Sequence, residues 1–205
     1  AAGDPAAGFN GAGGRGDIAM MDAIGFQAAA LGNHEFDAGT PALRAVIVRD
    51  AAVGYPGTAF PYLSANLGFA SDASLAGLVS TPGQNAASLS NRIAKSTVIS
   101  VAGQLIGVIG ATTPDLRSIS SPGGVTVSQN IAAEVQAAVD ALLPLGVNKI
   151  IVVAHLQQYP LEFGLAQSLR EVDVVIAGGS HAIFAKPSDP LRVGDQASES
   201  YPVAF

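Results

Sequence analysis

Short apolar runs alternate along this chain with segments in which apolar residues recur at helical spacing. Six runs have the length and the residue types of strands, and the apolar runs near residues 150 and 174 are continuous enough for a sheet covered on both faces. Ala102-Gly103 lies between two of the runs and predicts a hairpin turn. The expected strands are residues 26–31, 62–67, 97–101, 104–111, 149–154 and 172–177.

Four segments between these runs predict helices. Thr40-Pro41 is a favourable helix start, because a capping residue is followed by proline at the first helical position. The expected helices are residues 17–24, 40–51, 130–143 and 160–170, with loop at 5–16, irregular structure at 68–92 and loop again from 185 onward. The alternation of strands and helices predicts an α/β or layered α+β fold.

Composition narrows the classes of function. Hydrophobic residues make up 49% of the 205 positions and charged residues 13%, which indicates a sizeable core. The net charge is −6 and the ten Lys and Arg residues are scattered, so we expect no nucleic-acid polymer as a partner. We expect no membrane span, because no apolar run reaches the roughly 18–20 residues that one needs. The chain has no cysteine, which excludes disulfides, thiolate metal sites and a cysteine nucleophile.

Candidate chemistry gathers around three histidines. His34, His155 and His181 each follow an apolar strand-like run. A single histidine in such a place is usually a surface residue, but parallel neighbouring strands would bring all three to one crevice. Asn33 adds an oxygen donor beside His34, and Asp37 is placed to fix a histidine tautomer.

The segment Gly32-Asn33-His34-Glu35-Phe36-Asp37 closely resembles the Gly-Asn-His-Glu-Phe-Asp motif of the 5'-nucleotidase branch of the calcineurin-like metallophosphoesterases. Further segments along the chain resemble the same family. They are Ala2-Gly3-Asp4, Pro61-Tyr62-Leu63-Ser64-Ala65-Asn66-Leu67, Val152-Val153-Ala154-His155-Leu156 and Asp173-Val174-Val175-Ile176-Ala177-Gly178-Gly179-Ser180-His181.

The resemblance implies an αββα sandwich and a binuclear metal centre. By this resemblance Asp4 bridges two divalent metal ions, Asn33 and His155 bind the second ion, and His181 completes the shell of the first. The identity of the ions stays open among Zn, Mn, Fe, Mg and Ca. Two cations about 3.5–4 Å apart generate a hydroxide and neutralise phosphoryl oxygens.

The resemblance gives His34 a catalytic role without a metal bond. His34 would stabilise the transferring phosphoryl group or protonate the leaving oxygen, and Asp37 would orient it. The expected activity is hydrolysis of a phosphomonoester, with a small phosphate ester or a nucleotide as substrate. The resemblance also predicts a periplasmic or extracellular location.

Two features depart from the family pattern. The family takes an Asp-x-His pair from a strand upstream of the bridging aspartate, and only three residues precede Asp4. We therefore expect residues 1–205 to be a partial metallophosphoesterase domain that lacks its N-terminal metal-ligand strand and its C-terminal end, and that needs the remainder of a parent chain for activity. Gly179 stands where the family usually has a second metal-binding histidine.

A different class of function stays open. Gly179 favours a non-catalytic scaffold or binding domain of an exported or surface protein with a degenerate metal site, whereas the retention of Asn33, His34, Asp37 and His155 favours an enzyme. A dinucleotide-binding fold is excluded, because no apolar strand leads into the glycine-rich segment 11–16.

Overall fold

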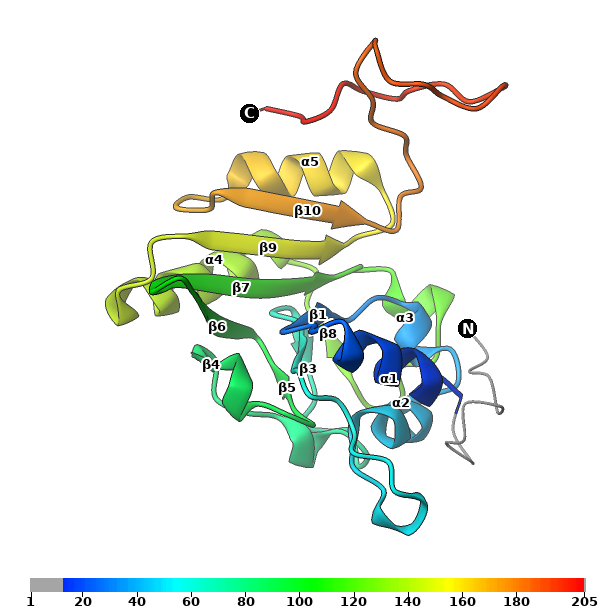
Figure 1. Ribbon diagram of the computed structural model, residues 1–205, viewed down its shortest axis with the longest axis vertical. Coiled ribbons are helices and arrows are strands. Elements are labelled where there is room, and N and C mark those ends of the chain that lie inside the picture. Colours follow the sequence, from blue (N-terminus) through cyan, green and yellow to red (C-terminus); the bar gives the residue numbers. More distant parts are fainter. Residues whose placement is uncertain (1–12, 205) are drawn as a thin grey trace.

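Two sheets packed between two layers of helices form the part of the chain that the computed structural model describes, residues 13–204 (Figure 1). The larger sheet has the strand order β10 (Val174–Gly178), β9 (Ile150–His155), β7 (Gln104–Thr112), β6 (Ser96–Val101), β4 (Gln84–Asn85). Its neighbours are parallel except for the β6–β7 hairpin. The smaller sheet is parallel, in the order β1 (Ala29–Ala30), β2 (Tyr62–Leu63), β5 (Ile93–Ala94). A separate antiparallel pair joins β3 (Leu67–Gly68) to β8 (Thr126–Val127).

The helices cover the outer faces of the two sheets. Buried residues of α4 (Ile131–Leu142) and α5 (Tyr159–Ser168) join those of β7 and β9 in one core cluster. Residues of α1 (Arg15–Ala23) and α2 (Thr40–Ile47) join those of the smaller sheet in another. The remaining short helices are α3 (Leu116–Ile119) and the 3₁₀ turns His34–Phe36, Ala51–Val53, Ala76–Leu78, Ala86–Ser88 and Leu143–Leu145. The αββα arrangement expected from the family resemblance is confirmed.

The two sheets meet through buried aliphatic side chains. A third buried cluster contains Leu63 of β2, Ala94 of β5 and Val108 of β7. At Gly110 of β7 the backbones approach so closely that a β-carbon would lie 2.1 Å from the carbonyl oxygen of Leu63. Glycine at position 110 therefore fixes how near β7 lies to the smaller sheet.

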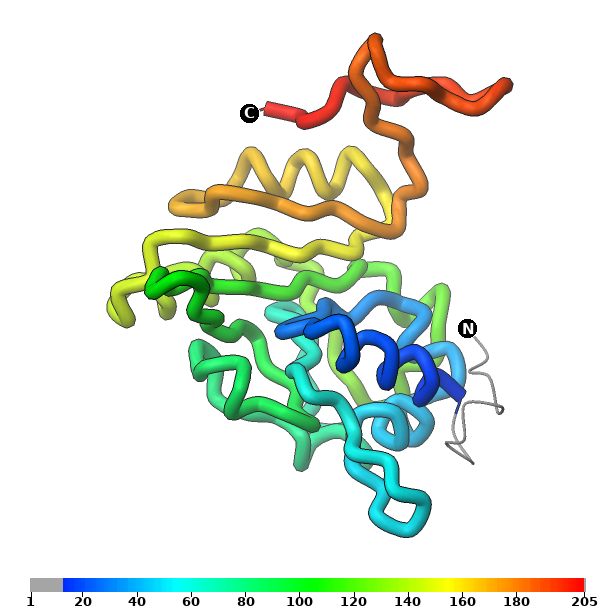
Figure 2. Tube along the Cα trace, viewed as in Figure 1, coloured from blue at the N-terminus to red at the C-terminus, as the bar shows by residue number. Residues whose placement is uncertain are grey.

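The apolar runs of the larger sheet were predicted well. Strands β6, β7, β9 and β10 lie close to where the sequence placed them. The turn at Ala102 (φ 49°) and Gly103 (φ 77°) has both central residues at positive φ, as a type I′ hairpin turn requires. Helices α4 and α5 also match their expected ranges within one or two residues. A continuous chain trace from β9 through α5 to β10 is visible in Figure 2.

Other expectations were wrong in detail. The strand expected over 26–31 pairs only at Ala29–Ala30. The strand expected over 62–67 is divided between β2 of the smaller sheet and β3 of the separate antiparallel pair. The helix expected to reach residue 51 ends at Ile47, because Val48 is extended and the chain turns back through the Asp50–Tyr55 bridge. Helix α1 starts inside the expected loop, at Arg15, whose guanidinium pairs with Asp50 at 3.1 Å. Among residues 13–204, no helix has the length and apolar character needed to cross a bilayer.

Candidate functional site

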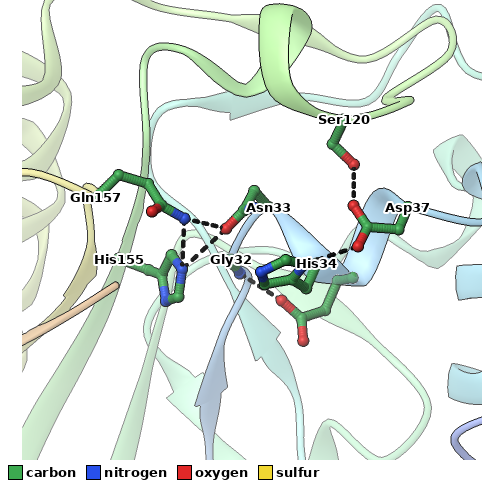
Figure 3. Close-up of polar contacts among 8 residues, drawn as sticks. Gly32, Asn33, His34, Asp37, Ser120, His155 and Gln157 are labelled. Carbon is green, nitrogen blue, oxygen red and sulfur yellow. Dashed lines mark hydrogen bonds and ion pairs between the residues drawn. The ribbon is translucent and has the colours of Figure 1, made fainter. Parts of the chain in front are cut away.

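Strand ends from both sheets meet at one edge of the molecule. His155 is the last residue of β9, and it lies in register with Thr112 at the end of β7 and with Gly178 at the end of β10. Strand β1 of the smaller sheet runs into Gly32 and Asn33 beside it, as Figure 3 shows. The sequence predicted that the three histidines would meet at one crevice, and the structure places Asn33, the neighbour of His34, against His155.

A buried hydroxyl network fixes the loop that carries Asn33. The Thr112 hydroxyl lies 2.7 Å from the carbonyl oxygen of Leu31, to which it donates, and 2.9 Å from the hydroxyl of Ser64. Asn66 exchanges two hydrogen bonds with the backbone of Thr112, at 2.8 and 2.9 Å. Buried polar groups that are fully hydrogen-bonded favour a single arrangement, so this network fixes the position of Leu31 and of the residues that follow it.

Asn33 and His155 bring two atoms that can bind a cation close together. Asn33 is buried, with 5% of its surface exposed, and its Oδ1 lies 3.0 Å from Nε2 of His155. On the other side of the loop the Gly32 N–H donates to Oε2 of Glu35 at 2.7 Å, which holds the turn (Figure 3). An amide oxygen and an imidazole nitrogen at this spacing suit a shared divalent cation.

The imidazole of His155 lies close against two glycines. A β-carbon at Gly32 would lie 3.0 Å from the ring, and one at Gly179 would lie 2.7 Å from Nε2. Burial lowers the pKa of His155, and the charges of His34 and His181 lower it further, against an opposing effect of Glu35. A lowered pKa keeps the ring neutral, with a lone pair free to bind a cation.

His34 faces away from this pair, toward solvent. Its Nδ1 lies 2.7 Å from Oδ2 of Asp37, whose Oδ1 accepts a hydrogen bond from the Ser120 hydroxyl at 2.8 Å. The side chains of His34 and Asp37 are 67% and 50% exposed. The hydrogen bond with His34, followed by that with Ser120, lowers the pKa of Asp37. The carboxylate therefore stays charged and holds Nδ1 of the ring, which leaves Nε2 for another partner (Figure 3).

Gln157 enters the site although sequence reasoning missed it. Its side-chain amide nitrogen donates to Oδ1 of Asn33 and lies 3.2 Å from Nε2 of His155. Ser120 was also missed, since it lies 83 positions from its partner Asp37. The only available signal for Gln157 was a polar residue two positions after a strand-end histidine, and that pattern is typical of any loop.

Two predicted metal ligands, His181 and Asp4, remain. His181 follows β10 by three residues, is exposed, and has a positive φ of 55°. Its charge contributes to lowering the pKa of His155. Asp4 lies outside the described residues. Within residues 13–204, no three His, Cys, Asp or Glu side chains are grouped so that they could hold a metal ion.

The donor chemistry nevertheless fits a divalent cation at Asn33 and His155. Oδ1 of Asn33 and Nε2 of His155 lie 3.0 Å apart, burial lowers the pKa of the imidazole, and the oxygen comes from an amide rather than from a carboxylate. Amide oxygens do not enter a count of His, Cys and acidic residues, but they bind hard divalent cations.

Comparisons with known proteins identify relatives of this chain. The chain is 32% identical to mouse (Mus musculus) 5'-nucleotidase over 173 residues, which is 84% of the chain and 27% of that protein. It is 31% identical to the snake venom 5'-nucleotidase of Naja atra over 194 residues, 95% of the chain and 32% of that protein. No family model matches the chain.

A solved structure gives the same answer. The 5'-nucleotidase precursor of Thermus thermophilus superposes with a TM-score of 0.73 and 34% identity, over 93% of this chain and 32% of that one. The chain thus spans about a third or less of each of these proteins. Within that span, this chain belongs to the 5'-nucleotidase branch of the calcineurin-like metallophosphoesterases.

Proposed function

We propose that this chain carries the catalytic strand ends of a metal-dependent phosphomonoester hydrolase that acts on nucleoside 5'-monophosphates. The proposal rests on one juxtaposition. Asn33 and His34 are adjacent in the chain, yet Asn33 points to the partly buried His155 and His34 points to the exposed Asp37. One dipeptide thus supplies a cation ligand on one side and a solvent-facing proton donor on the other.

The chain's own residues divide the work of phosphate ester cleavage. His34, oriented through Nδ1 by Asp37, offers its other nitrogen to a phosphoryl oxygen or to the leaving oxygen. Ser120 holds the second oxygen of Asp37, which limits rotation of the carboxylate. Bound divalent cations would supply positive charge for the phosphoryl oxygens and lower the pKa of an attacking water.

The proposed metal centre has two divalent ions. Asn33 and His155 would hold the second ion together with Asp4, which would bridge the two, and His181 would belong to the first ion. The domain assignment is also a proposal: residues 1–205 would form part of a metallophosphoesterase domain within a longer protein. Relatives include a venom enzyme, which supports the proposal that this protein acts outside the cytoplasm, in the periplasm or the extracellular space.

A non-catalytic scaffold is the second candidate, and Gly179 favours it. The position that the family uses for a further imidazole has no side chain, and the His155 ring fills the adjacent space. A scaffold has no need of the exposed hydrogen bonds that link His34, Asp37 and Ser120, however, so these hydrogen bonds favour the enzyme.

Phosphate release from AMP by the longest natural form of the protein separates the two candidates. The protein is stripped with a chelator and then supplied with Mn²⁺, Zn²⁺ or Mg²⁺. The enzyme proposal expects hydrolysis that chelation abolishes and a divalent cation restores, and that His34→Asn reduces without changing the melting temperature. Absence of hydrolysis with every cation, in protein that remains folded, would favour the scaffold.

A further inference from the structure

Gly179 has no side chain that could bind a cation, which raises the question of which other side chain completes the cation site at Asn33 and His155. The nearest candidate by hydrogen bonding is Gln157, because its terminal amide contacts both predicted ligands, Oδ1 of Asn33 and Nε2 of His155. Like His155, Gln157 is partly buried, whereas its neighbour Gln158 is exposed and reaches Asp115 at 3.3 Å instead.

The backbone at Gln157 is held in an unfavourable conformation that directs this side chain. Its φ is +70°, in the left-handed region that favours glycine and that few glutamines adopt. Such outliers persist where the surrounding structure enforces them, and they concentrate at functional sites. Glycine would relieve the strain at position 157 but would remove the amide.

A side chain at position 179 has no equivalent access. Gly179 has a φ of +89°, and a β-carbon there would lie 2.7 Å from Nε2 of His155. The backbone of Gly32 also lies close to the ring, since a β-carbon there would lie 3.0 Å from it. An imidazole at 179 is therefore incompatible with this position of His155, and Gln157 approaches the same ligands from the loop after β9.

We propose that Gln157 is a cation ligand of this chain, whose amide oxygen completes the set formed by Asn33 and His155 in place of an imidazole at position 179. The proposal rests on the function proposed above. In the structure the amide nitrogen of Gln157 donates to Oδ1 of Asn33 and lies 3.2 Å from Nε2 of His155. The amide carries its oxygen on the same carbon, so a half-turn about the last bond presents an acceptor to the same point.

The test is Mn²⁺ binding, measured by titration calorimetry on the metal-free protein in its longest natural form. Removing a ligand should weaken Mn²⁺ binding by at least about 10-fold in Gln157→Ala and in Gln157→Gly. Gln157→Glu keeps a ligand oxygen but removes the N–H donors, so it should bind Mn²⁺ at least as tightly as the natural protein. Gln158→Ala makes the same substitution at the adjacent position, and this variant should bind Mn²⁺ like the natural protein.

Each other outcome overturns the proposal in a recognisable way. Unchanged binding in Gln157→Ala would show that the amide has no role, and tighter binding would show that it competes with the cation. Weak binding in both Gln157→Glu and Gln157→Ala would assign the amide to hydrogen bonding alone. If the natural protein binds no more Mn²⁺ than Asn33→Ala does, the proposed metal-dependent function fails as well. Melting temperatures confirm that every variant is folded.

Discussion

The imidazole of His155 lies directly against Gly179, so close that a β-carbon on this glycine would come within 2.7 Å of Nε2. The glycine that interrupts the family pattern is thus also the residue that gives His155 its place. A substitution at 179 acts on the neighbouring imidazole before it can contribute any chemistry of its own.

Gly179→Ala should therefore destabilise the protein. The new methyl group would meet the His155 ring and occupy a φ of +89°, and together these effects should lower the free energy of unfolding by about 2–4 kcal/mol. Gly178→Ala is the matched control, because its β-carbon would meet atoms only at 3.5 and 3.7 Å, which is ordinary contact. Urea unfolding measures both variants, and equal stability of the two would contradict this description of the site.

His34 and Asp37 should differ in how strongly their loss reduces turnover. His34→Asn removes the proton donor itself, so kcat for AMP hydrolysis should fall by about 10²–10⁴-fold. Asp37→Asn leaves the ring in place but weakens its orientation, and a loss of about 10- to 100-fold is expected. A loss confined to KM in either variant would assign these residues to substrate binding rather than to the chemical step.

The Thr112 hydroxyl should stabilise the folded protein through its hydrogen bonds beside the site. Thr112→Val keeps the shape but leaves the Leu31 carbonyl and the Ser64 hydroxyl without this partner, which should cost about 1–3 kcal/mol of stability. Thr112→Ser keeps the hydroxyl and should retain most of the stability. Thermal or urea unfolding distinguishes the two, and a Val variant as stable as the Ser variant would argue against the network.

Glu162 should make stability depend on pH. It is buried, and burial raises the pKa of its carboxyl group above the ordinary value, although hydrogen bonds with Leu156, Ser180 and Gly178 act in the opposite direction. The folded protein therefore keeps the proton over a pH range in which the unfolded chain has lost it. This contribution to stability is present below the ordinary pKa and is lost as pH rises through the raised one.

Glu162→Gln removes this titration and keeps an oxygen for the Leu156 N–H, which donates at 3.2 Å. Relative to the natural protein, the Gln variant should gain unfolding free energy as pH rises from about 4 to about 8. Glu171→Gln, at an exposed position, is the control. Parallel stability profiles for Glu162→Gln and the natural protein would contradict the raised pKa.

The sequence predicted the larger sheet and the principal site residues for physical reasons. Strand β9 is covered by α4 on one face and meets the smaller sheet on the other, so its apolar residues run without interruption and mark a strand. Asn33 and His34 were found through a motif of six consecutive residues, which single-residue reasoning would not have identified.

The rest depends on contacts between distant segments. Strand β1 has only two paired residues, so no local pattern defines its ends. Arg15 was expected in a loop, and its burial beside Asp50 and over the Tyr55 ring depends on partners 35 and 40 positions away. Gln157 contacts Asn33 across 124 positions, and a glutamine in a loop carries no sign of such a partner.

The measurement that tests the central claim most directly is the metal content of the longest natural form of the protein, by elemental mass spectrometry. It is made alongside phosphate release from AMP and repeated with Asn33→Ala and Asp4→Ala. We predict about two divalent ions per chain in the active natural protein, and loss of both bound metal and activity in each variant. A folded natural protein that holds only trace metal and releases no phosphate would contradict the binuclear hydrolase.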